Sequence, residues 1–295
     1  MNRFYILLIL ISFCQFSLAQ DVNQLSTDER GREMLLGDIT KEGLTSNSFN
    51  DWFAENYEAY TPDASVIDKL KRKLKKYQIT VFMGTWCGDS KREVPRFFKL
   101  LEAANFPEEK LRVIGVHNAR SQYKQAPNGE EKGKNIHRVP TFIVYNKRGK
   151  EVGRIVEHPV ESLEADLLKI CRKKSYQHNY QIVTKLHQLF EKKGTKYILE
   201  NPESILKKLQ PYSQSLKELN TYGHVLLYAE EMDKAIATFT LNTQLFPTDK
   251  KSFTSLAAAY FMANDYENAA TYYSKVLTLD ANDEKAKMML AKMEK

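Results

Sequence analysis

Between residues 63 and 172, short apolar runs alternate with stretches whose apolar residues recur at helical spacing. The apolar runs predict buried strands at 79–84, 111–117 and 142–145, and the turn at 146–149 predicts a fourth strand at 151–156. The stretches with helical spacing predict helices at 63–76, 87–104 and 161–171. Turn residues between the last two strands predict a hairpin. We therefore expect residues 63–172 to form an α/β domain, a central mixed sheet flanked by helices, with its core elements in the order βαβ–ββα.

The C-terminal part of the chain is helical throughout and repeats itself. Residues 173–215 are expected to form a connector, in which Gly194 ends one helix and the pair Asn201–Pro202 begins the next. From residue 216, a pattern of small and large apolar residues recurs after 34 residues: Ala235, Phe239 and Leu245 return as Ala269, Tyr273 and Leu279. This period resembles that of tetratricopeptide repeats. The resemblance implies an all-α region with two repeats, 216–249 and 250–283, and a C-terminal capping helix.

The N-terminal residues have the pattern of an export signal. Arg3 supplies a positive charge, an apolar stretch follows, and Ser17-Leu18-Ala19 has the small-x-small form of a cleavage site. We expect residues 1–19 to be a signal peptide and residues 20–62 to be an extension with short helices. The apolar stretch is about half of the roughly 20 residues that a bilayer span needs, so no membrane insertion is expected once the signal is removed. Bulky Phe13 argues against lipid attachment at Cys14.

The charge pattern gives no sign of a nucleic-acid partner. Arg3 is the only charged residue of the predicted signal, so its removal changes the formal charge from +7 to +6. The densest basic run, Lys69–Lys76, contains Leu70 and Leu74 at helical spacing, which indicates the solvent-facing side of an amphipathic helix. No nucleic-acid reading motif accompanies these lysines, and we expect no nucleic acid as a partner.

Cysteine and histidine usage limits the chemistry. Cys87 and Cys171 are the cysteines that remain after the signal, too few for a disulfide-stapled fold. The 42% of hydrophobic residues is ample for two apolar cores. The histidines have no ligand spacing, so neither a metal site nor a cofactor is expected.

The most informative segment is Thr85-Trp86-Cys87-Gly88-Asp89-Ser90-Lys91, which lies between a predicted strand and a helix that contains Pro95. A thiol in the first turn of a helix meets unpaired backbone N–H groups and the positive end of the helix dipole, so we expect a lowered pKa for Cys87. Lys91 and Arg92 favour the thiolate, whereas Asp89 opposes it. With the later Val139-Pro140-Thr141, this pattern resembles the thioredoxin family over about residues 65–172.

The resemblance implies roles for the residues around Cys87. Cys87 would be the nucleophile, with Ser90, Trp86 and Pro140 completing the catalytic group. Pro140 corresponds to a cis-proline that faces the active cysteine, with the backbone of Val139 as a docking edge. We expect substrate to contact Trp86, Gly88, Asp89, Val139, Pro140 and Glu157. His158 follows Glu157, and the sequence is equally consistent with a surface role and with a catalytic role for it.

Departures from the family pattern matter more than the matches. Ser90 stands where the family has its second cysteine, and a hydroxyl cannot form a disulfide, although it can donate a hydrogen bond to a thiolate. The family's buried acid falls on Val81 and its nearby lysine on Gly115, so both proton-handling groups are missing. Cys171 lies about ten residues along a helix, roughly 15 Å from its start, too far to serve as the resolving thiol.

Two functions follow from these observations. The first is thiol–disulfide exchange through Cys87 alone, of the mixed-disulfide or isomerase type, on exported client proteins with disulfides or oxidised cysteines. The second is a redox-inactive adaptor, in which the thioredoxin-like domain binds partners and the repeats bind a peptide or protein. Exported bacterial thioredoxin-like proteins combine such parts, which implies a periplasmic location. Hydrolysis has no support, because no Gly-x-Ser-x-Gly elbow is present.

Overall fold

The structure is a computed structural model that describes residues 22–293. The predicted signal peptide and Cys14 lie outside the described residues. The N-terminal half contains a six-stranded sheet with the strand order β1-β2-β4-β3-β5-β6. Its strands are β1 (Gln24–Thr27), β2 (Glu33–Ile39), β3 (Gln78–Met83), β4 (Leu111–Gly115), β5 (Thr141–Tyr145) and β6 (Glu151–Val156). β3 and β4 pair in parallel, and the other neighbouring pairs are antiparallel. The mixed sheet is therefore confirmed.

Helices cover one face of this sheet. They are α1 (Lys41–Leu44), α2 (Asn50–Glu58), α3 (Ala64–Leu74), α4 (Gly88–Ala103) and α5 (Leu163–Cys171). Side chains of α2 to α5 share one buried cluster with alternate residues of the strands, such as Val81 and Phe142. The predicted amphipathic helix is α3, which Asp63 caps by accepting hydrogen bonds from two backbone N–H groups.

The opposite face of the sheet is covered by a long segment, residues 118–139, which we call the covering loop. Its residues Ala126, Ile136 and Val139 form a second buried cluster with Phe82 and Ile114 of the sheet. Backbone hydrogen bonds tie its start to β4, since His117 N–H donates to Gln125 O and Lys124 N–H donates to His117 O. Most residues of the loop are polar, but its few apolar residues give it a core of its own.

The strands β1 and β2 are not expected from the sequence, which suggests short helices for residues 20–62. Met34, Leu35 and Leu36 are buried because β2 lies between β1 and β4. Leu35 N–H also donates to the Thr85 hydroxyl over 3.0 Å, which joins β2 to the segment around Cys87. The run is short and contains a glycine, so only its tertiary partners make it a strand. The aromatic helix that the sequence places after it is present as α2.

The C-terminal half is all-helical, with α6 (Gln181–Glu200), α7 (Pro202–Leu209), α8 (Leu216–Tyr228), α9 (Met232–Leu245), α10 (Lys250–Met262), α11 (Tyr266–Leu279) and α12 (Glu284–Met293). The hairpin α8–α9 and the hairpin α10–α11 begin and end 34 residues apart. Gly194 breaks α6 with φ of 78°, as predicted. Asn201, in contrast, makes no side-chain capping bond to α7; its amide donates to Tyr197 O instead.

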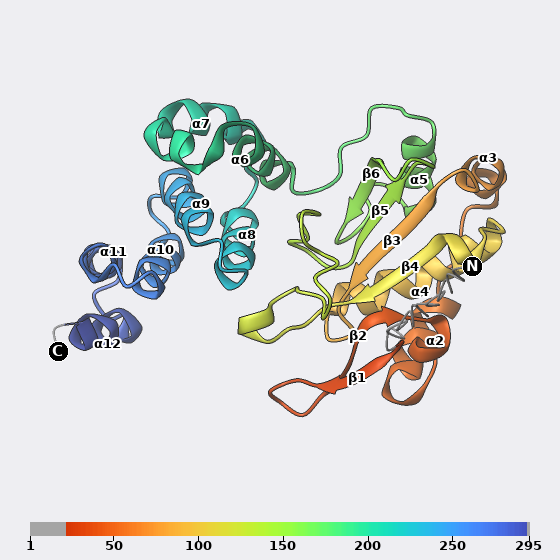
Figure 1. The fold of residues 1–295 in the computed structure, drawn as a ribbon, viewed down its shortest axis with the longest axis horizontal. Helices are drawn as coiled ribbons and strands as arrows, with labels where there is room; N and C mark the ends of the chain where they lie inside the picture. Colours follow the sequence, from red (N-terminus) through yellow and green to blue (C-terminus); the bar gives the residue numbers. More distant parts are fainter. Residues whose placement is uncertain (1–21, 294–295) are drawn as a thin grey trace, which may run out of the picture.

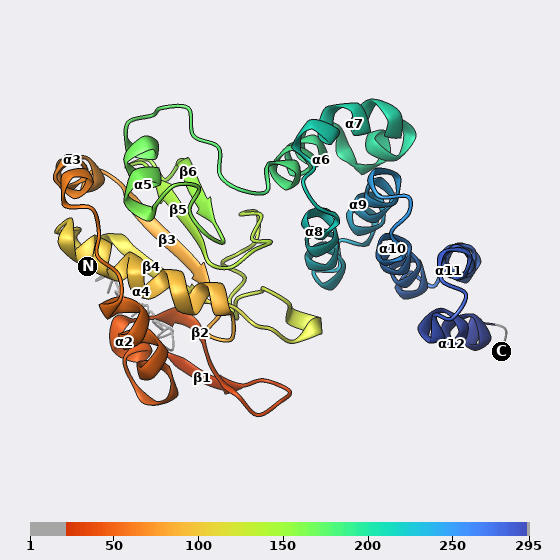
Figure 2. The same ribbon diagram turned by 180° about the vertical axis from the view of Figure 1, so that it is seen from behind.

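The two halves meet through the covering loop. Figures 1 and 2 show its tip lying beside α8, while an extended segment after α5 leads to α6. Gln125 donates to Tyr228 O over 2.8 Å, and Arg138 donates to Lys217 O over 3.2 Å. The contact joins the side of the sheet that carries the thiol motif to the first helical hairpin. Within residues 22–293, no helix has the length and apolar character that a membrane crossing requires.

Candidate functional site

Cys87 lies where β3 leads into α4. It is the N-cap residue of α4, and its side chain makes no capping hydrogen bond. The first-turn N–H groups of this 16-residue helix therefore remain directed toward the Cys87 side of the turn. The thiol is partly exposed, and its Sγ donates a hydrogen bond to Val139 O over 3.3 Å. The predicted nucleophile thus sits at a helix N-terminus and within reach of solvent.

The segment opposite the thiol is Val139–Pro140. The peptide bond between them is cis, which confirms the prediction for Pro140. Both residues are buried, and Val139 is only 2% exposed, so the backbone edge that the sequence predicts at Val139 is covered in this structure. The Val139 carbonyl accepts from the Cys87 thiol, and the Val139 N–H has no hydrogen-bond partner within residues 22–293. An unpaired backbone donor therefore lies in the buried segment that faces the sulfur.

Trp86 and Ser90 are brought beside Cys87, but they serve different contacts. Trp86 is half-buried, and its indole N–H donates to Val116 O over 2.8 Å. Ser90 is completely buried, and its hydroxyl accepts from Gly84 N–H over 3.2 Å. Over the described chain there is no hydrogen bond between Ser90 and Cys87, although the sequence suggests one. The Ser90 hydroxyl instead fixes the turn between β3 and α4.

The charged residues beside Cys87 largely neutralise one another. Arg92 forms ion pairs with Asp89, at 2.8 Å, and with buried Glu93, at 2.7 Å. These carboxylates raise the pKa of the Arg92 guanidinium, with Glu93 the larger cause. The Lys91 ammonium lies over the Trp52 ring, 5.7 Å from its centroid. Lys91 and Arg92 therefore contribute less positive charge at Cys87 than their sequence positions suggest.

Lys124 is a site residue that the sequence does not reveal. Its residue is only 4% exposed, and its Nζ donates to His137 O over 2.6 Å and lies 4.6 Å from the centroid of the Tyr123 ring. No carboxylate forms an ion pair with it within residues 22–293. Burial, the largest cause, and the charge of Arg138 lower the pKa of Lys124 to about 7, although Cys87 and Glu157 act to raise it. The thiol and a buried amine of the covering loop are thus close enough to interact electrostatically.

Glu157 follows β6 and is held from several sides. Its N–H donates to Pro140 O over 2.7 Å, and its carboxylate accepts from Arg138 over 3.1 Å and from the Tyr180 hydroxyl. The Arg138 guanidinium also stacks over the Tyr180 ring at 4.7 Å. The Glu157 carboxylate is therefore engaged in joining the cis-proline segment to the start of α6. His158 is exposed and contacts Asn179 rather than Cys87.

The second thiol is far less accessible than the first. Cys171 ends α5, is 7% exposed, and packs in the main core of the α/β half. Burial raises its pKa to about 12. Both cysteines are free thiols. Cys171 is thus a packed residue, as the sequence predicts.

Gly115 explains why the family's lysine is missing. A Cβ atom at Gly115 would lie 2.3 Å from Leu35 O, because β2 packs directly against this position. The added N-terminal strand thus leaves no room for a side chain there. The buried amine near Cys87 is that of Lys124, which comes from the covering loop. No sequence signal distinguishes this lysine from its exposed neighbours in the loop.

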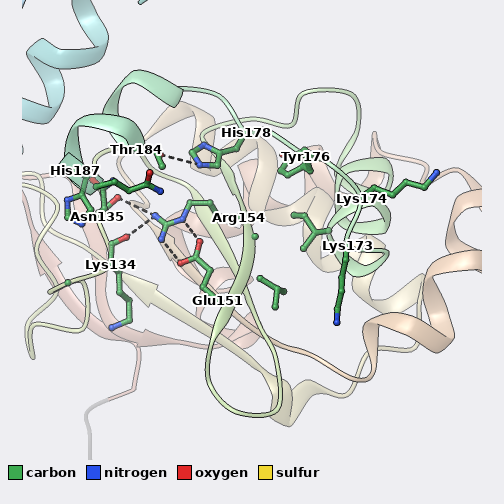
Figure 3. A pocket seen from close by; sticks show the side chains of 15 residues that line it. Lys134, Asn135, Glu151, Arg154, Lys173, Lys174, Tyr176, His178, Thr184 and His187 are labelled. Carbon is green, nitrogen blue, oxygen red and sulfur yellow. Dashed lines mark hydrogen bonds and ion pairs between the residues drawn. The ribbon is translucent and has the colours of Figure 1, made fainter. Parts of the chain in front are cut away.

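A cavity of about 580 Å³ lies away from Cys87, between β6, the end of α5 and the start of α6. Figure 3 shows Arg154 at its centre, paired with Glu151 at 2.6 Å, while Lys173 and Lys174 project away. Arg154 also donates to Lys134 O and Asn135 O, and both of these residues belong to the covering loop. Its guanidinium is committed to holding this loop against β6. Within residues 22–293, no group of three or more His, Cys, Asp or Glu side chains could hold a metal ion.

Comparison with known proteins gives one family match, which agrees with this geometry. A family model described as Thioredoxin matches residues 45–168. A solved structure, a protein of unknown function, PA1234, from Pseudomonas aeruginosa, is 14% identical, with a TM-score of 0.32, over 41% of this chain and 82% of its own. No curated protein matches the sequence. The family match, the element order and the Cys87–cis-Pro140 pair together lead to one conclusion: residues 45–168 lie in a thioredoxin-like domain, which an all-helical region follows.

Proposed function

We propose that this protein carries out thiol–disulfide exchange on client polypeptides through Cys87 alone. The observation that supports the proposal best is the position of the thiol, partly exposed at the N-terminus of α4 and 3.3 Å from Val139 O. The unpaired Val139 N–H would offer a hydrogen bond to the backbone of an extended client once the segment that buries Val139 moves aside. In the proposal, this contact would bring a client sulfur next to the nucleophile.

The reaction is a pair of sulfur displacements. The Cys87 thiolate attacks one sulfur of a client disulfide, forms a Cys87–client bond and expels the other client sulfur as a thiolate. A second thiolate, from the client itself or from a small thiol, then attacks the client sulfur of the mixed disulfide and releases Cys87 as a thiolate. When the client supplies that thiolate, the sequence is an isomerisation with no net oxidation or reduction.

Lys124 fits the proton transfers of this cycle. With a pKa of about 7, its amine is poised between the neutral and the charged form near neutral pH. The neutral amine accepts the thiol proton as Cys87 becomes a thiolate, and the ammonium returns it to the departing client sulfur. The buried amine would thus do the work of the two proton-handling groups that the sequence lacks at Val81 and Gly115.

Net reduction of clients is not part of the proposal, because no second thiol accompanies Cys87. Ser90 replaces it, and Cys171 is buried in the core. The two helical hairpins offset by 34 residues would act as tetratricopeptide repeats that bind a partner. Export to the periplasm completes the proposal and rests on the signal pattern of residues 1–19.

A redox-inactive adaptor is the second candidate. It is favoured by the hydrogen bond from the Cys87 thiol to Val139 O, which satisfies the proton of a resting, unreactive thiol. In this function the surface around half-buried Trp86 binds a partner without covalent chemistry.

Reaction with an activated disulfide separates these candidates. A peptide cysteine joined to thionitrobenzoate is mixed with the protein, release of the chromophore is followed against pH, and the adduct is located by intact mass. Exchange predicts a rate at least tenfold above that of glutathione at pH 7, lost in Cys87→Ser and retained in Cys171→Ser. A rate no faster than that of glutathione would reject exchange and leave the adaptor function.

A further inference from the structure

A second recess, of about 500 Å³, lies between the covering loop and the helices α8, α10 and α12. We call it the interdomain groove. The covering loop contributes Arg120 and Tyr123, and the helices contribute His224, Tyr228, Phe261 and Lys285. Figure 1 shows the tip of the covering loop reaching toward α8 at this place. Its volume is in the range of ligand pockets, roughly 300–1,000 Å³.

The groove has a one-sided charge. Arg120 and Lys285 are both exposed, neither forms an ion pair within residues 22–293, and no residue that lines the groove is acidic. His224 adds no charge at neutral pH, because burial, with Lys285 and Arg120 nearby, lowers its pKa to about 4. Two unpaired cations on opposite walls of a recess without carboxylates attract a negatively charged occupant.

The floor between these cations is apolar and adaptable. Phe261, Met262 and Met289 line it, and Met262 is 47% exposed. Flexible methionine side chains beside aromatic rings suit apolar side chains of varied shape. An occupant that satisfies the whole groove therefore combines carboxylates with large apolar groups, as an acidic segment of a polypeptide does.

The groove is continuous with the Cys87 site through a row of rings. Trp86 lies 6.3 Å from Tyr123, and Tyr123 lies 6.3 Å from Tyr228, measured between ring centroids. Tyr123 thus contacts the thiol motif on one side and lines the groove on the other. One extended chain can follow this row from the groove to the sulfur.

We propose that the interdomain groove binds an acidic, apolar-rich segment of the client polypeptide whose cysteine reacts at Cys87. The choice of a client segment rests on the proposed function, whereas binding in the groove needs no thiol. The two ideas can therefore fail separately.

The test uses fluorescein-labelled short peptides that alternate glutamate with leucine, with glutamine–leucine and lysine–leucine peptides as controls, in fluorescence anisotropy with the full mature chain. We expect the glutamate peptide to bind best. Arg120→Glu with Lys285→Glu should weaken its binding at least tenfold, and Lys275→Glu, an exposed charge reversal on α11 outside the groove, should leave it unchanged. Cys87→Ala should bind as the parent does.

Three outcomes of the binding experiment would overturn the inference. Equal binding of the three peptides, no binding at millimolar concentration, or unchanged binding by the double variant would show that the groove does not select acidic segments. Sedimentation velocity tests whether a second copy of this chain occupies the groove instead. If the parent chain dimerises and the double variant does not, the groove binds that second copy. If the peptide binds as expected but Cys87 proves unreactive, the groove proposal stands and the exchange function falls.

Discussion

The α/β half and the helical half bury very different residues. The α/β half carries buried ionisable groups, among them Lys124 and Glu93, close to a partly exposed thiol. The helical half buries small residues against large rings: Gly223, Ala235 and Ala269 are buried, and a Cβ at Gly223 would lie 2.4 Å from the Phe239 ring. The α/β half therefore bears the cost of burying several ionisable groups near a partly exposed thiol, whereas the helical half, in which Glu218 is also buried, gains stability mainly from close helix packing. The two halves are joined at the covering loop.

The test with the largest expected effect removes one buried aromatic ring from either half of the molecule. Phe142 packs 4.4 Å from Phe97 in the α/β half, whereas Phe239 packs in the helical half, and both are fully buried. Either substitution by alanine should cost about 3–5 kcal/mol of unfolding free energy. We expect Phe239→Ala to lower the urea midpoint of the helical half and to spare the rate of Cys87 alkylation in dilute urea. Phe142→Ala should change the rate of Cys87 alkylation in dilute urea and spare the urea midpoint of the helical half. If both halves unfold in one shared urea transition in both variants, the division into two halves is contradicted.

An intermediate effect concerns Lys124 and pH. The Lys124 pKa is about 7 in the folded chain against an ordinary 10.5, so between these values the unfolded chain binds more protons and the parent gains stability as pH rises. Below pH 7 the full cost of the buried ammonium is present. Lys124→Met removes that cost. The unfolding free energy of the variant minus that of the parent should therefore be roughly 2 to 3 kcal/mol larger at pH 6 than at pH 9.

Urea unfolding at the two pH values measures this difference. Lys132→Met, at an exposed lysine of the same loop, serves as the control and should show no such dependence. The proposed proton transfer adds a kinetic expectation, namely that Lys124→Met slows exchange at Cys87 and removes the inflection near pH 7 from its rate profile. A variant that is equally stable relative to the parent at both pH values would show that Lys124 is not buried as an amine.

The smallest effect is expected at the contact between the halves. Tyr228→Ala removes the edge-to-face contact with Tyr123, worth about 0.5–1.5 kcal/mol. The α/β half should keep its own stability, and proteolysis within residues 172–180 should become several-fold faster, whereas the helical half also loses the stacking of Tyr228 on His224. Tyr266→Ala, which removes an exposed ring on α11, is the matched control. Unchanged proteolysis in Tyr228→Ala would show that the rings do not hold the halves together.

The sequence predicts most of the fold because its signals are local. Apolar runs mark β3 to β5, the turn at 146–149 marks β6, Asp63 marks the start of α3, and the 34-residue offset marks the two helical hairpins. Cys87 and cis-Pro140 could likewise be predicted, since each belongs to a short motif. The strand β2 could not, because its three apolar residues become a strand only between β1 and β4.

Lys124 could not be predicted either, because its environment also depends on residues distant in the sequence. Its hydrogen-bond acceptor, His137 O, is 13 residues further along and is brought to it by the path of the covering loop, whereas Tyr123 is its direct neighbour in the sequence. The commitment of Glu157 to Arg138 and Tyr180 is equally non-local, because it joins β6, the cis-proline segment and α6. Residues whose role depends on three separate segments leave no pattern in any one of them.

The covering loop also has a consequence for recombination. Its backbone belongs to the α/β half, yet Gln125 and Arg138 donate to carbonyl groups of α8. A chimera that exchanges the helical half for another array would have to keep the carbonyl positions of Lys217 and Tyr228, or the loop that houses the amine would lose its outer support. Natural swaps of the helical half are therefore constrained at α8 more tightly than at α12.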